Sequence, residues 1–356
     1  MIITRTPLRI SFFGGGTDYP VWYREHGGAV IATTINKCCY ITCRYLPPFF
    51  EHHSRISYSQ VENVHSNDAI EHPSVRSCLH FLKIDGGIEI HHVADLPARA
   101  GLGTSSAFTV GLLLGLYALR NQMRDKHALA ADAIYVEQRL LQEAVGSQDQ
   151  VSAAYGGFNR INFHPDDTIE VNPVLAEPNR LAELEQHLAL YFTGFSRTAS
   201  DVAKEQIRLT PHRTRELGVM LEMVNEAEAV ITNTRTPLEE FGRLLHESWK
   251  LKKSLTHNIS NSSIDEIYDA GRSAGAIGGK LLGAGGGGFV LFFVPPERRQ
   301  ALRARLNKLL CIPFSFSTRG SHVIVYEPEE LYDKALTAER FEVYTQPDRP
   351  RLKISA

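Results

Sequence analysis

The most informative stretch of the chain is residues 95–107, Asp-Leu-Pro-Ala-Arg-Ala-Gly-Leu-Gly-Thr-Ser-Ser-Ala. A β-rich segment ends at a proline, a glycine-rich turn follows, and three hydroxyl residues begin a long apolar helix. Glycines let the backbone approach a ligand closely, and the unpaired N–H groups at a helix start attract an anion. One hydroxyl residue suffices to cap a helix, so three of them behind Gly-Leu-Gly favour a phosphate site.

A second glycine-rich segment is residues 280–289, Lys-Leu-Leu-Gly-Ala-Gly-Gly-Gly-Gly-Phe, and an apolar strand follows it. Gly283, Gly285 and Gly288 match the dinucleotide fingerprint GxGxxG, but that motif needs a strand before it and a helix after it. The order is reversed here, and the spacing of a Walker A loop is also absent. Consecutive glycines cost chain entropy, so we expect this loop to pass close to another backbone or to a ligand.

The N-terminal segment, residues 5–20, reads Arg-Thr-Pro-Leu-Arg-Ile-Ser-Phe-Phe-Gly-Gly-Gly-Thr-Asp-Tyr-Pro. A strand carries Arg9 and leads into a glycine turn that places Asp18 at its far end. An isolated aspartate in such a turn often only closes an Asx turn. Beside two other glycine loops, we favour Asp18 as an acceptor of hydrogen bonds from sugar hydroxyls.

Two further carboxylates complete a candidate site. Glu137 lies beside the apolar stripe of a helix expected over residues 126–145, although a lone glutamate there is more often solvated or paired. Asp149 follows Gly146, which we expect to end that helix, so its carboxylate can project into a cleft. Phosphoryl transfer needs such parts: a phosphate cradle, a metal ion between phosphate oxygens, and a carboxylate near the attacking hydroxyl.

Composition limits the remaining possibilities. The chain has 356 residues, 43% of them hydrophobic, and a formal net charge of −2, which predicts two globular domains and no attraction to nucleic acid or membrane surfaces. Five cysteines without CxxC spacing argue against disulfides and structural zinc, and the paired histidines are expected to be surface residues. The N-terminus does not resemble a signal peptide, so we expect a cytoplasmic protein with reduced thiols.

The order of expected elements is that of an α+β protein rather than a regular βαβ alternation. Strands are expected at 2–3, 8–13, 29–45, 88–93, 188–193, 289–294, 313–317 and 322–326. Helices are expected at 105–119, 126–145, 199–209, 211–233, 238–255, 263–274 and 296–310. The stretch 165–187 is rich in Pro, Asp and Asn, so we place a domain boundary there and predict domains 1–185 and 186–356.

Together the four segments resemble the GHMP kinases, the family of galactokinase, homoserine kinase, mevalonate kinase and phosphomevalonate kinase. PARAGLGTSSA is similar to the family's phosphate loop, with Thr104 where serine is commoner, and KLLGAGGGGF is similar to its C-terminal glycine motif. The similarity extends over about residues 1–330. It implies an α+β fold with a left-handed βαβ N-terminal domain and a ferredoxin-like C-terminal domain.

The resemblance also implies an ATP-dependent sugar kinase that uses Mg2+. Ser106 and Glu137 match the metal ligands, with Ser105 as the alternative to Ser106, and Asp149 matches the catalytic carboxylate. Arg9 would polarise the reacting oxygen or pair with Asp18 or Asp149. The residues implied to bind ATP are Pro97, Gly101, Leu102, Gly103, Thr104, Ser105, Ser106, Gly285 and Gly286.

The acceptor side is most similar to the D-glycero-D-manno-heptose 7-phosphate kinases, which phosphorylate the anomeric oxygen. Glycine stands at position 16 where galactokinases carry histidine, which argues against galactose. The residues implied to bind the sugar phosphate are Gly15, Gly16, Thr17, Asp18 and Tyr19, with Arg197 as a candidate for its phosphate. The alternatives are a fucokinase-like or N-acetylhexosamine kinase, and a non-catalytic regulator that binds ATP or sugar. The sequence does not determine an oligomeric state.

Overall fold

A computed structural model of the chain describes residues 1–47, 49–98, 101–194 and 199–327. The helices are α1 (Pro20–His26), α2 (Pro73–Phe81), α3 (Thr104–Leu119), α4 (Lys126–Tyr135), α5 (Gln148–Tyr155), α6 (Pro178–His187), α7 (Ala199–Leu209), α8 (Thr214–Thr232), α9 (Glu239–Leu255), α10 (Ser262–Ser273) and α11 (Arg299–Arg305). The strands are β1 (Ile2–Phe13), β2 (Gly28–Tyr45), β3 (Ser54–Ser57), β4 (Val61–Val64), β5 (Ile88–Ala94), β6 (Phe158–Phe163), β7 (Ile169–Pro173), β8 (Leu188–Phe192), β9 (Gly278–Leu281), β10 (Phe289–Phe293), β11 (Leu310–Ile312), β12 (Phe316–Ser317) and β13 (His322–Tyr326).

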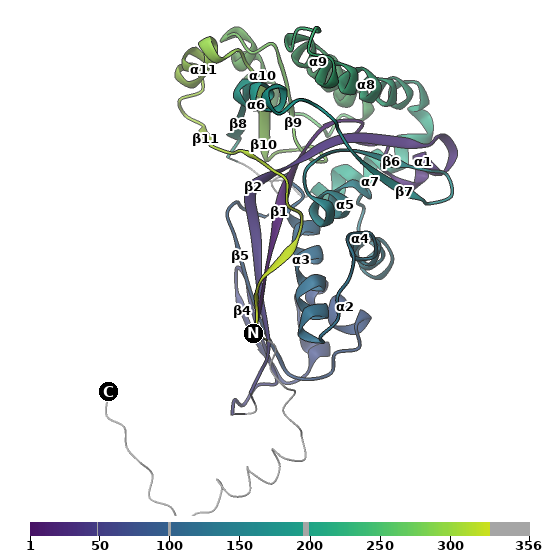
Figure 1. Cartoon of the computed structure of the whole chain (residues 1–356), viewed down its shortest axis with the longest axis vertical. Helices are drawn as coiled ribbons and strands as arrows, with labels where there is room; N and C mark the ends of the chain where they lie inside the picture. The colour runs from purple at the N-terminus through teal and green to yellow at the C-terminus, as the bar shows by residue number, and fades with distance from the viewer. Residues whose placement is uncertain (48, 99–100, 195–198, 328–356) are drawn as a thin grey trace, which may run out of the picture.

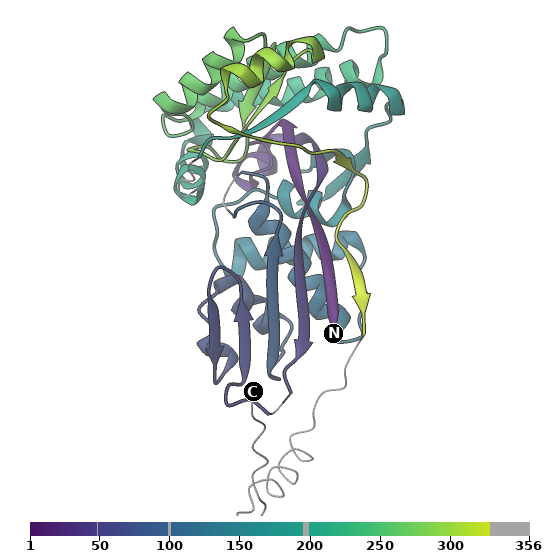
Figure 2. The ribbon, with the colours of Figure 1, turned by 90° about the vertical axis from the view of Figure 1, so that its left-hand side faces the viewer.

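The first sheet is built around the long antiparallel pair β1–β2. Within the described residues it has nine strands in the order β13-β1-β2-β5-β3-β4, with β6, β7 and β12 joined on beside β2. The 18-residue strand β2 pairs with β6 at its start and with β5 at its end, so it runs the length of the sheet. Helices α2 to α5 cover one face (Figure 1), and the opposite face is bare in Figure 2.

Helix α3 is the central helix of this sheet and is buried along almost its whole length, as its apolar sequence predicts. Two of its glycines allow it to lie close to the strands. A Cβ on Gly111 would stand 2.6 Å from Thr6 Oγ1, and one on Gly115 would stand 3.1 Å from Cys43 Sγ. The start of α3 is therefore fixed against the sheet, which positions the glycine turn before it.

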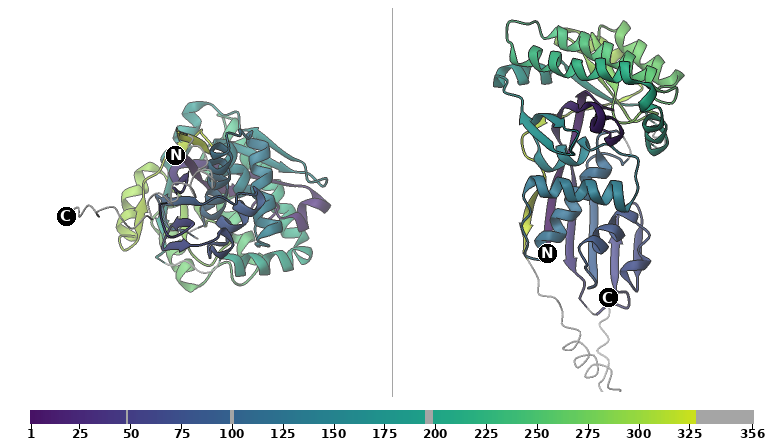
Figure 3. Two further views of the ribbon diagram at one scale, coloured as in Figure 1. Left: turned by 90° about the horizontal axis from the view of Figure 1, so that it is seen from below. Right: turned by 90° about the vertical axis from the view of Figure 1, so that its right-hand side faces the viewer.

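The second sheet has four antiparallel strands in the order β11-β8-β10-β9. Its chain order, strand–helices–strand–strand–helix–strand, is that of a ferredoxin-like unit, as the sequence predicted. Figure 3 shows its helices gathered at one end of an elongated molecule. In the part of the chain that the structure describes, no helix has the length and apolar character needed to cross a bilayer.

The chain returns to the first sheet after it completes the second. Strand β12 pairs with β2, and β13 pairs with β1 in antiparallel register. The division into 1–185 and 186–356 stays a prediction, and these two strands argue that residues 316–326 pack with the first domain. A sequence-based boundary misses such a return because the strands carry no mark of the sheet that they join.

Two expected helices were wrong in their extent. The helix expected over 296–310 is shorter, because α11 (Arg299–Arg305) ends at Arg305 and β11 begins at Leu310. The helix expected over 126–145 ends earlier: α4 continues as one π-helical turn, Val136–Leu140, and a new helix, α5, begins at Gln148. Asp149 thus lies in the first turn of α5 rather than after a helix end. The stretch 165–187, in which the domain boundary was placed, contains β7 and α6. Its Pro173 and Pro178 stand at the end of the strand and the start of the helix, where proline is tolerated.

The two glycine-rich loops lie against each other where the two sheets meet. A Cβ on Gly101 would stand 2.4 Å from the carbonyl oxygen of Leu282, and one on Gly283 would stand 2.5 Å from Gly101 Cα. Both glycines have positive φ, +84° and +77°. The expected close approach of a glycine loop to another backbone is thereby confirmed, and the partner is the phosphate loop itself.

This contact predicts a large cost for adding a single methyl group. Gly283→Ala should lower the free energy of unfolding by at least about 2 kcal/mol, because the residue has positive φ and its Cβ would overlap Gly101. Urea unfolding measures the change. Gly218→Ala in α8 is the control, since nothing lies within 4 Å of its Cβ and alanine stabilises a helix interior by about 1 kcal/mol. Equal effects of the two substitutions would contradict the contact.

Candidate active site

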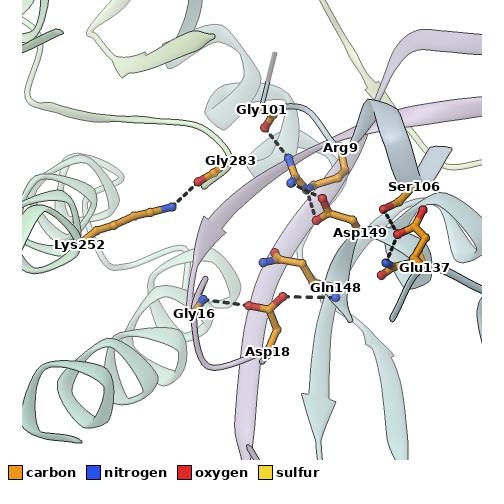
Figure 4. A network of polar contacts seen from close by, with 11 residues as sticks. Arg9, Gly16, Asp18, Gly101, Ser106, Glu137, Gln148, Asp149, Lys252 and Gly283 are labelled. Carbon is orange, nitrogen blue, oxygen red and sulfur yellow. Dashed lines mark hydrogen bonds and ion pairs between the residues drawn. The ribbon is translucent and has the colours of Figure 1, made fainter. Parts of the chain in front are cut away.

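Arg9 connects three parts of the site. The pairing of β1 with β2 shifts register between Pro7 and Arg9, where β2 contains two more residues than β1. The Arg9 backbone N–H donates to the carbonyl oxygen of Leu102 at 3.0 Å. Its guanidinium donates to Gly101 O at 2.7 Å and to both carboxylate oxygens of Asp149 at 2.8 and 2.7 Å (Figure 4).

Asp149 is the more accessible member of this ion pair. Its side chain is 25% exposed, whereas that of Arg9 is 6% exposed. The first turn of α5 also provides a favourable place for a negative charge. Each carboxylate oxygen keeps acceptor capacity after binding Arg9, so Asp149 can receive a hydrogen bond from a ligand without breaking the pair. Of the two partners expected for Arg9, Asp149 is the one that it contacts.

Asp18 holds the glycine turn and the start of α5 together. Its carboxylate accepts hydrogen bonds from the backbone N–H groups of Gly16 at 2.9 Å and Gln148 at 3.5 Å. A Cβ on Gly146 would stand 1.8 Å from Asp18 Oδ2, so Gly146 serves this approach rather than a helix end. Burial raises the pKa of Asp18, the hydrogen bond from Gly16 opposes the increase, and the charge of Asp149 adds to it. Its contact with a sugar hydroxyl stays a prediction.

The side chains next to Asp18 are also buried and make contacts within or beside the same turn. Thr17 is fully buried, and its hydroxyl lies 2.8 Å from Gly14 O and 2.9 Å from Ala29 O. Tyr19 is buried at the start of α1, where burial raises the pKa of its phenol. Thr17 and Tyr19 therefore shape this turn from inside, whatever ligand it meets.

Glu137 is the most deeply buried acid of the site, with no exposed surface. The π-helical turn Val136–Leu140 carries it, a local widening that is frequent at functional sites. Ser106 Oγ donates to Glu137 Oε2 at 2.8 Å, and Gln150 Nε2 donates to the same oxygen. The other oxygen, Oε1, has no hydrogen-bond partner among the described residues. Burial raises the pKa of Glu137 to about 7.

These atoms suit a magnesium ion. A carboxylate oxygen without a partner and a serine hydroxyl are hard oxygen ligands, and Mg2+ is typically bound by one or two protein groups plus phosphates and water. The described residues contain no group of three or more His, Cys, Asp or Glu side chains able to hold a metal. Phosphate oxygens and water would therefore complete the shell. Ser106 rather than the exposed Ser105 contacts Glu137, which favours Ser106 of the two serines, and its role as a metal ligand stays a prediction.

Two buried lysines were missed by the sequence analysis. Lys252 of α9 is 6% exposed and donates to Gly283 O, and Lys280 of β9 is 2% exposed and donates to Phe12 O at 2.8 Å. Burial lowers the pKa of Lys252 to about 8, and the charge of Arg9 adds to the decrease. Burial also lowers the pKa of Lys280. A signal was available for Lys252, which falls on the apolar stripe of α9 with Leu245 and Trp249.

The other predicted nucleotide residues occupy varied positions. Pro97 is exposed, and Leu102 is buried against the sheet. Gly285 and Gly286 pack on Ile259, so Gly283 makes the contact with the phosphate loop in their place. Arg197 lies outside the described residues.

Aromatic rings gather beside the start of α3. His72 stacks on Phe108 with 4.8 Å between ring centroids, and Tyr58 and His92 pack edge-on against these two rings. Burial lowers the pKa of both histidines, so neutral imidazoles are favoured in this cluster. Because Phe108 belongs to α3, the cluster packs on the first turns of that helix.

Two family models and several known proteins match this chain. Residues 73–157 match the family described as GHMP kinases N terminal domain, and residues 229–310 match GHMP kinases C terminal. The D-glycero-alpha-D-manno-heptose 7-phosphate kinase of Campylobacter jejuni is 30% identical over 335 residues, 90% of this chain and 97% of that protein.

Two further relatives extend the comparison. The bifunctional fucokinase/GDP-fucose pyrophosphorylase of Arabidopsis thaliana is 27% identical over a matched region that is 85% of this chain and 31% of that protein. The crystal structure of a D-glycero-D-manno-heptose 1-phosphate kinase from Bacteroides thetaiotaomicron superposes with a TM-score of 0.72 at 25% identity, covering 94% of this chain and all of that one.

The environment of Glu137 predicts how stability depends on pH. The carboxyl ionises near 4.5 in the unfolded chain and near 7 in the folded protein, so the folded state retains a proton that the unfolded state has lost. Stability should therefore fall as pH rises between these values. Urea unfolding without metal measures this effect. The free energy of unfolding of Glu137→Gln, relative to that of the wild type, should increase by about 1–3 kcal/mol between pH 5 and pH 8.

The same variant should lose the gain in ATP affinity that magnesium provides, because the uncharged amide is a poor ligand for the ion. Isothermal titration with and without Mg2+ measures this gain. Glu247→Gln, on the exposed face of α9, is the control for both experiments. Parallel pH curves and an unchanged response to magnesium would contradict the role of Glu137.

Proposed function

The chain belongs to the GHMP kinase family, and we propose that it phosphorylates the anomeric hydroxyl of D-glycero-D-manno-heptose 7-phosphate with ATP, giving the 1,7-bisphosphate. Membership makes the protein a phosphotransferase from ATP to a hydroxyl acceptor, and its relatives place it among the sugar kinases. The heptose acceptor and a role in making nucleotide-activated heptose are the finer parts of the proposal.

The observation that carries the proposal is the Arg9–Asp149 pair, held between the phosphate loop and the glycine turn of Asp18. A hydroxyl that binds Asp149 would lie beside Gly103, whose Cβ position is 3.4 Å from Asp149 Oδ2. The acceptor and the phosphates can thus meet at one point. Similarity to a heptose 7-phosphate kinase over 90% of the chain supports the choice of sugar.

In this reaction the chain contributes positioning and charge. The N–H groups at the start of α3 would bind the phosphates, and magnesium held by Ser106 and Glu137 would neutralise their charge during transfer. Arg9 fixes the Asp149 carboxylate, which orients the acceptor hydroxyl and accepts its proton as the new bond forms. An anomeric hydroxyl is more acidic than an ordinary alcohol, so orientation and electrostatics can supply most of the acceleration.

A substrate panel tests the acceptor. We would measure ADP release with Mg·ATP and heptose 7-phosphate, sedoheptulose 7-phosphate, mannose, fucose, galactose or N-acetylhexosamines. We expect activity only with the heptose 7-phosphate and a product phosphorylated at the anomeric carbon. Preference for fucose, which the similarity to fucokinases makes the second candidate, would overturn the heptose proposal but keep the kinase. ATP binding without turnover of any sugar would favour a non-catalytic regulator.

Asp149→Asn tests the catalytic carboxylate. We expect kcat to fall at least about 100-fold while the KM for Mg·ATP stays nearly constant, because the amide cannot accept the proton. The matched control is Asp167→Asn. Asp167 also forms an ion pair with two hydrogen bonds to one arginine, Arg24, at 2.8 and 3.1 Å, but this pair lies on the exposed surface. More than about a tenth of wild-type kcat in Asp149→Asn would show that this role is wrong.

A further inference from the structure

Lys252 and Lys280 have more donors than the described residues can satisfy. Each ammonium carries three N–H donors, and each makes one hydrogen bond, to Gly283 O and to Phe12 O respectively. Both side chains are almost completely buried. A buried cation without sufficient partners is costly, and an anion that binds from outside the chain would reduce this cost.

The surrounding charges also leave room for an anion. The charged groups that act on the two lysines are Arg9 from β1, Asp18 from the turn after β1, and Asp149 from α5. Arg9 and Asp149 already neutralise each other, so within the part of the chain that the structure describes the two lysines have no carboxylate paired with them. Burial lowers the pKa of both lysines, and an anion bound beside them would favour their charged forms.

The lysines lie on the acceptor side of the site. In Figure 4, Lys252 points towards the centre from the side opposite to Ser106 and Glu137, with Arg9 and Asp149 between them. Lys280 is bonded to Phe12, two residues before the first glycine of the Asp18 turn. A metal-bound nucleotide would occupy the Ser106–Glu137 side, whereas the remote end of a sugar held at Asp149 extends the other way.

We propose that Lys252, supported by Lys280, binds the phosphate that the acceptor already carries and so selects a phosphorylated sugar over a neutral one. The inference rests on the proposed function, because it assigns a subsite to the same acceptor. The phosphate takes the donors of Lys252 that Gly283 O leaves unused and supplies the missing negative charge. The subsite thus draws its charge from the second sheet and its helices, while the reacting hydroxyl is held by the first domain.

Lys252→Met tests the subsite, since methionine keeps an unbranched side chain of similar length without the charge. With heptose 7-phosphate the acceptor KM should rise about 10- to 100-fold, the range expected for a charged hydrogen bond, while the KM for ATP stays nearly constant. With the unphosphorylated heptose, a much poorer acceptor, the variant should lose at least about tenfold less of its kcat/KM than it loses with heptose 7-phosphate. Lys280→Met should show the same pattern more weakly, and it preserves the test if Lys252→Met does not fold.

Lys250→Ala is the matched control, because this lysine is on the same helix but exposed and paired with Glu247. An equal loss with both acceptors would overturn the proposal. A higher KM for ATP alone would assign Lys252 to the nucleotide and also overturn it.

A binding measurement separates this inference from the choice of substrate. Inorganic phosphate should bind the wild type, in the presence of a non-hydrolysable ATP analogue, at least about tenfold more tightly than it binds Lys252→Met. If no heptose phosphate is turned over but this difference is found, the proposed substrate is wrong and the phosphate subsite stands. If heptose 7-phosphate is turned over and Lys252→Met changes neither phosphate binding nor the acceptor KM, the subsite is wrong and the proposed function stands.

Discussion

The guanidinium of Arg9 is the interaction on which the arrangement of the site depends. It binds the carboxylate that starts α5 and the carbonyl of Gly101 in the phosphate loop, while its own backbone belongs to β1. Because the side chain is nearly buried, each of these bonds is worth more than it would be in water. The absence of a side chain at Gly103 helps to allow this geometry, since a Cβ there would stand 3.1 Å from Arg9 Cγ.

The contact between the glycine loops extends this constraint to the second sheet. Gly101, whose carbonyl binds Arg9, packs on Gly283, whose carbonyl binds Lys252. One backbone contact therefore lies between two buried cations that come from different domains. Any movement of the second sheet against the first would have to change this contact. A Cβ at Gly101 or Gly283 would overlap the opposite loop, which is the physical reason for glycine at these positions.

Sequence reasoning selected segments that the structure brings close together, but it misjudged the structural role of some residues. It identified the phosphate loop, Glu137 and Asp149 because each stands next to a strong local signal in the chain. It read Gly146 as a helix end, whereas the structure uses it to let Asp18 approach the start of α5. It also missed the π-helical turn around Glu137, since nothing in the local periodicity distinguishes a π turn from a continuous helix. Lys252 was overlooked although it interrupts an apolar stripe.

The sequence by itself determined the α+β class, the two glycine loops, the family and the residue types available for phosphate and metal. These follow from patterns within a few positions of each other, which local backbone preferences and side-chain chemistry govern. Only the tertiary structure decided that Arg9 pairs with Asp149, that Gly101 meets Gly283, and that β12 and β13 return to the first sheet. It also decided the raised pKa of Glu137 and the lowered pKa of Lys252, because burial and the distance between charges depend on how remote segments pack.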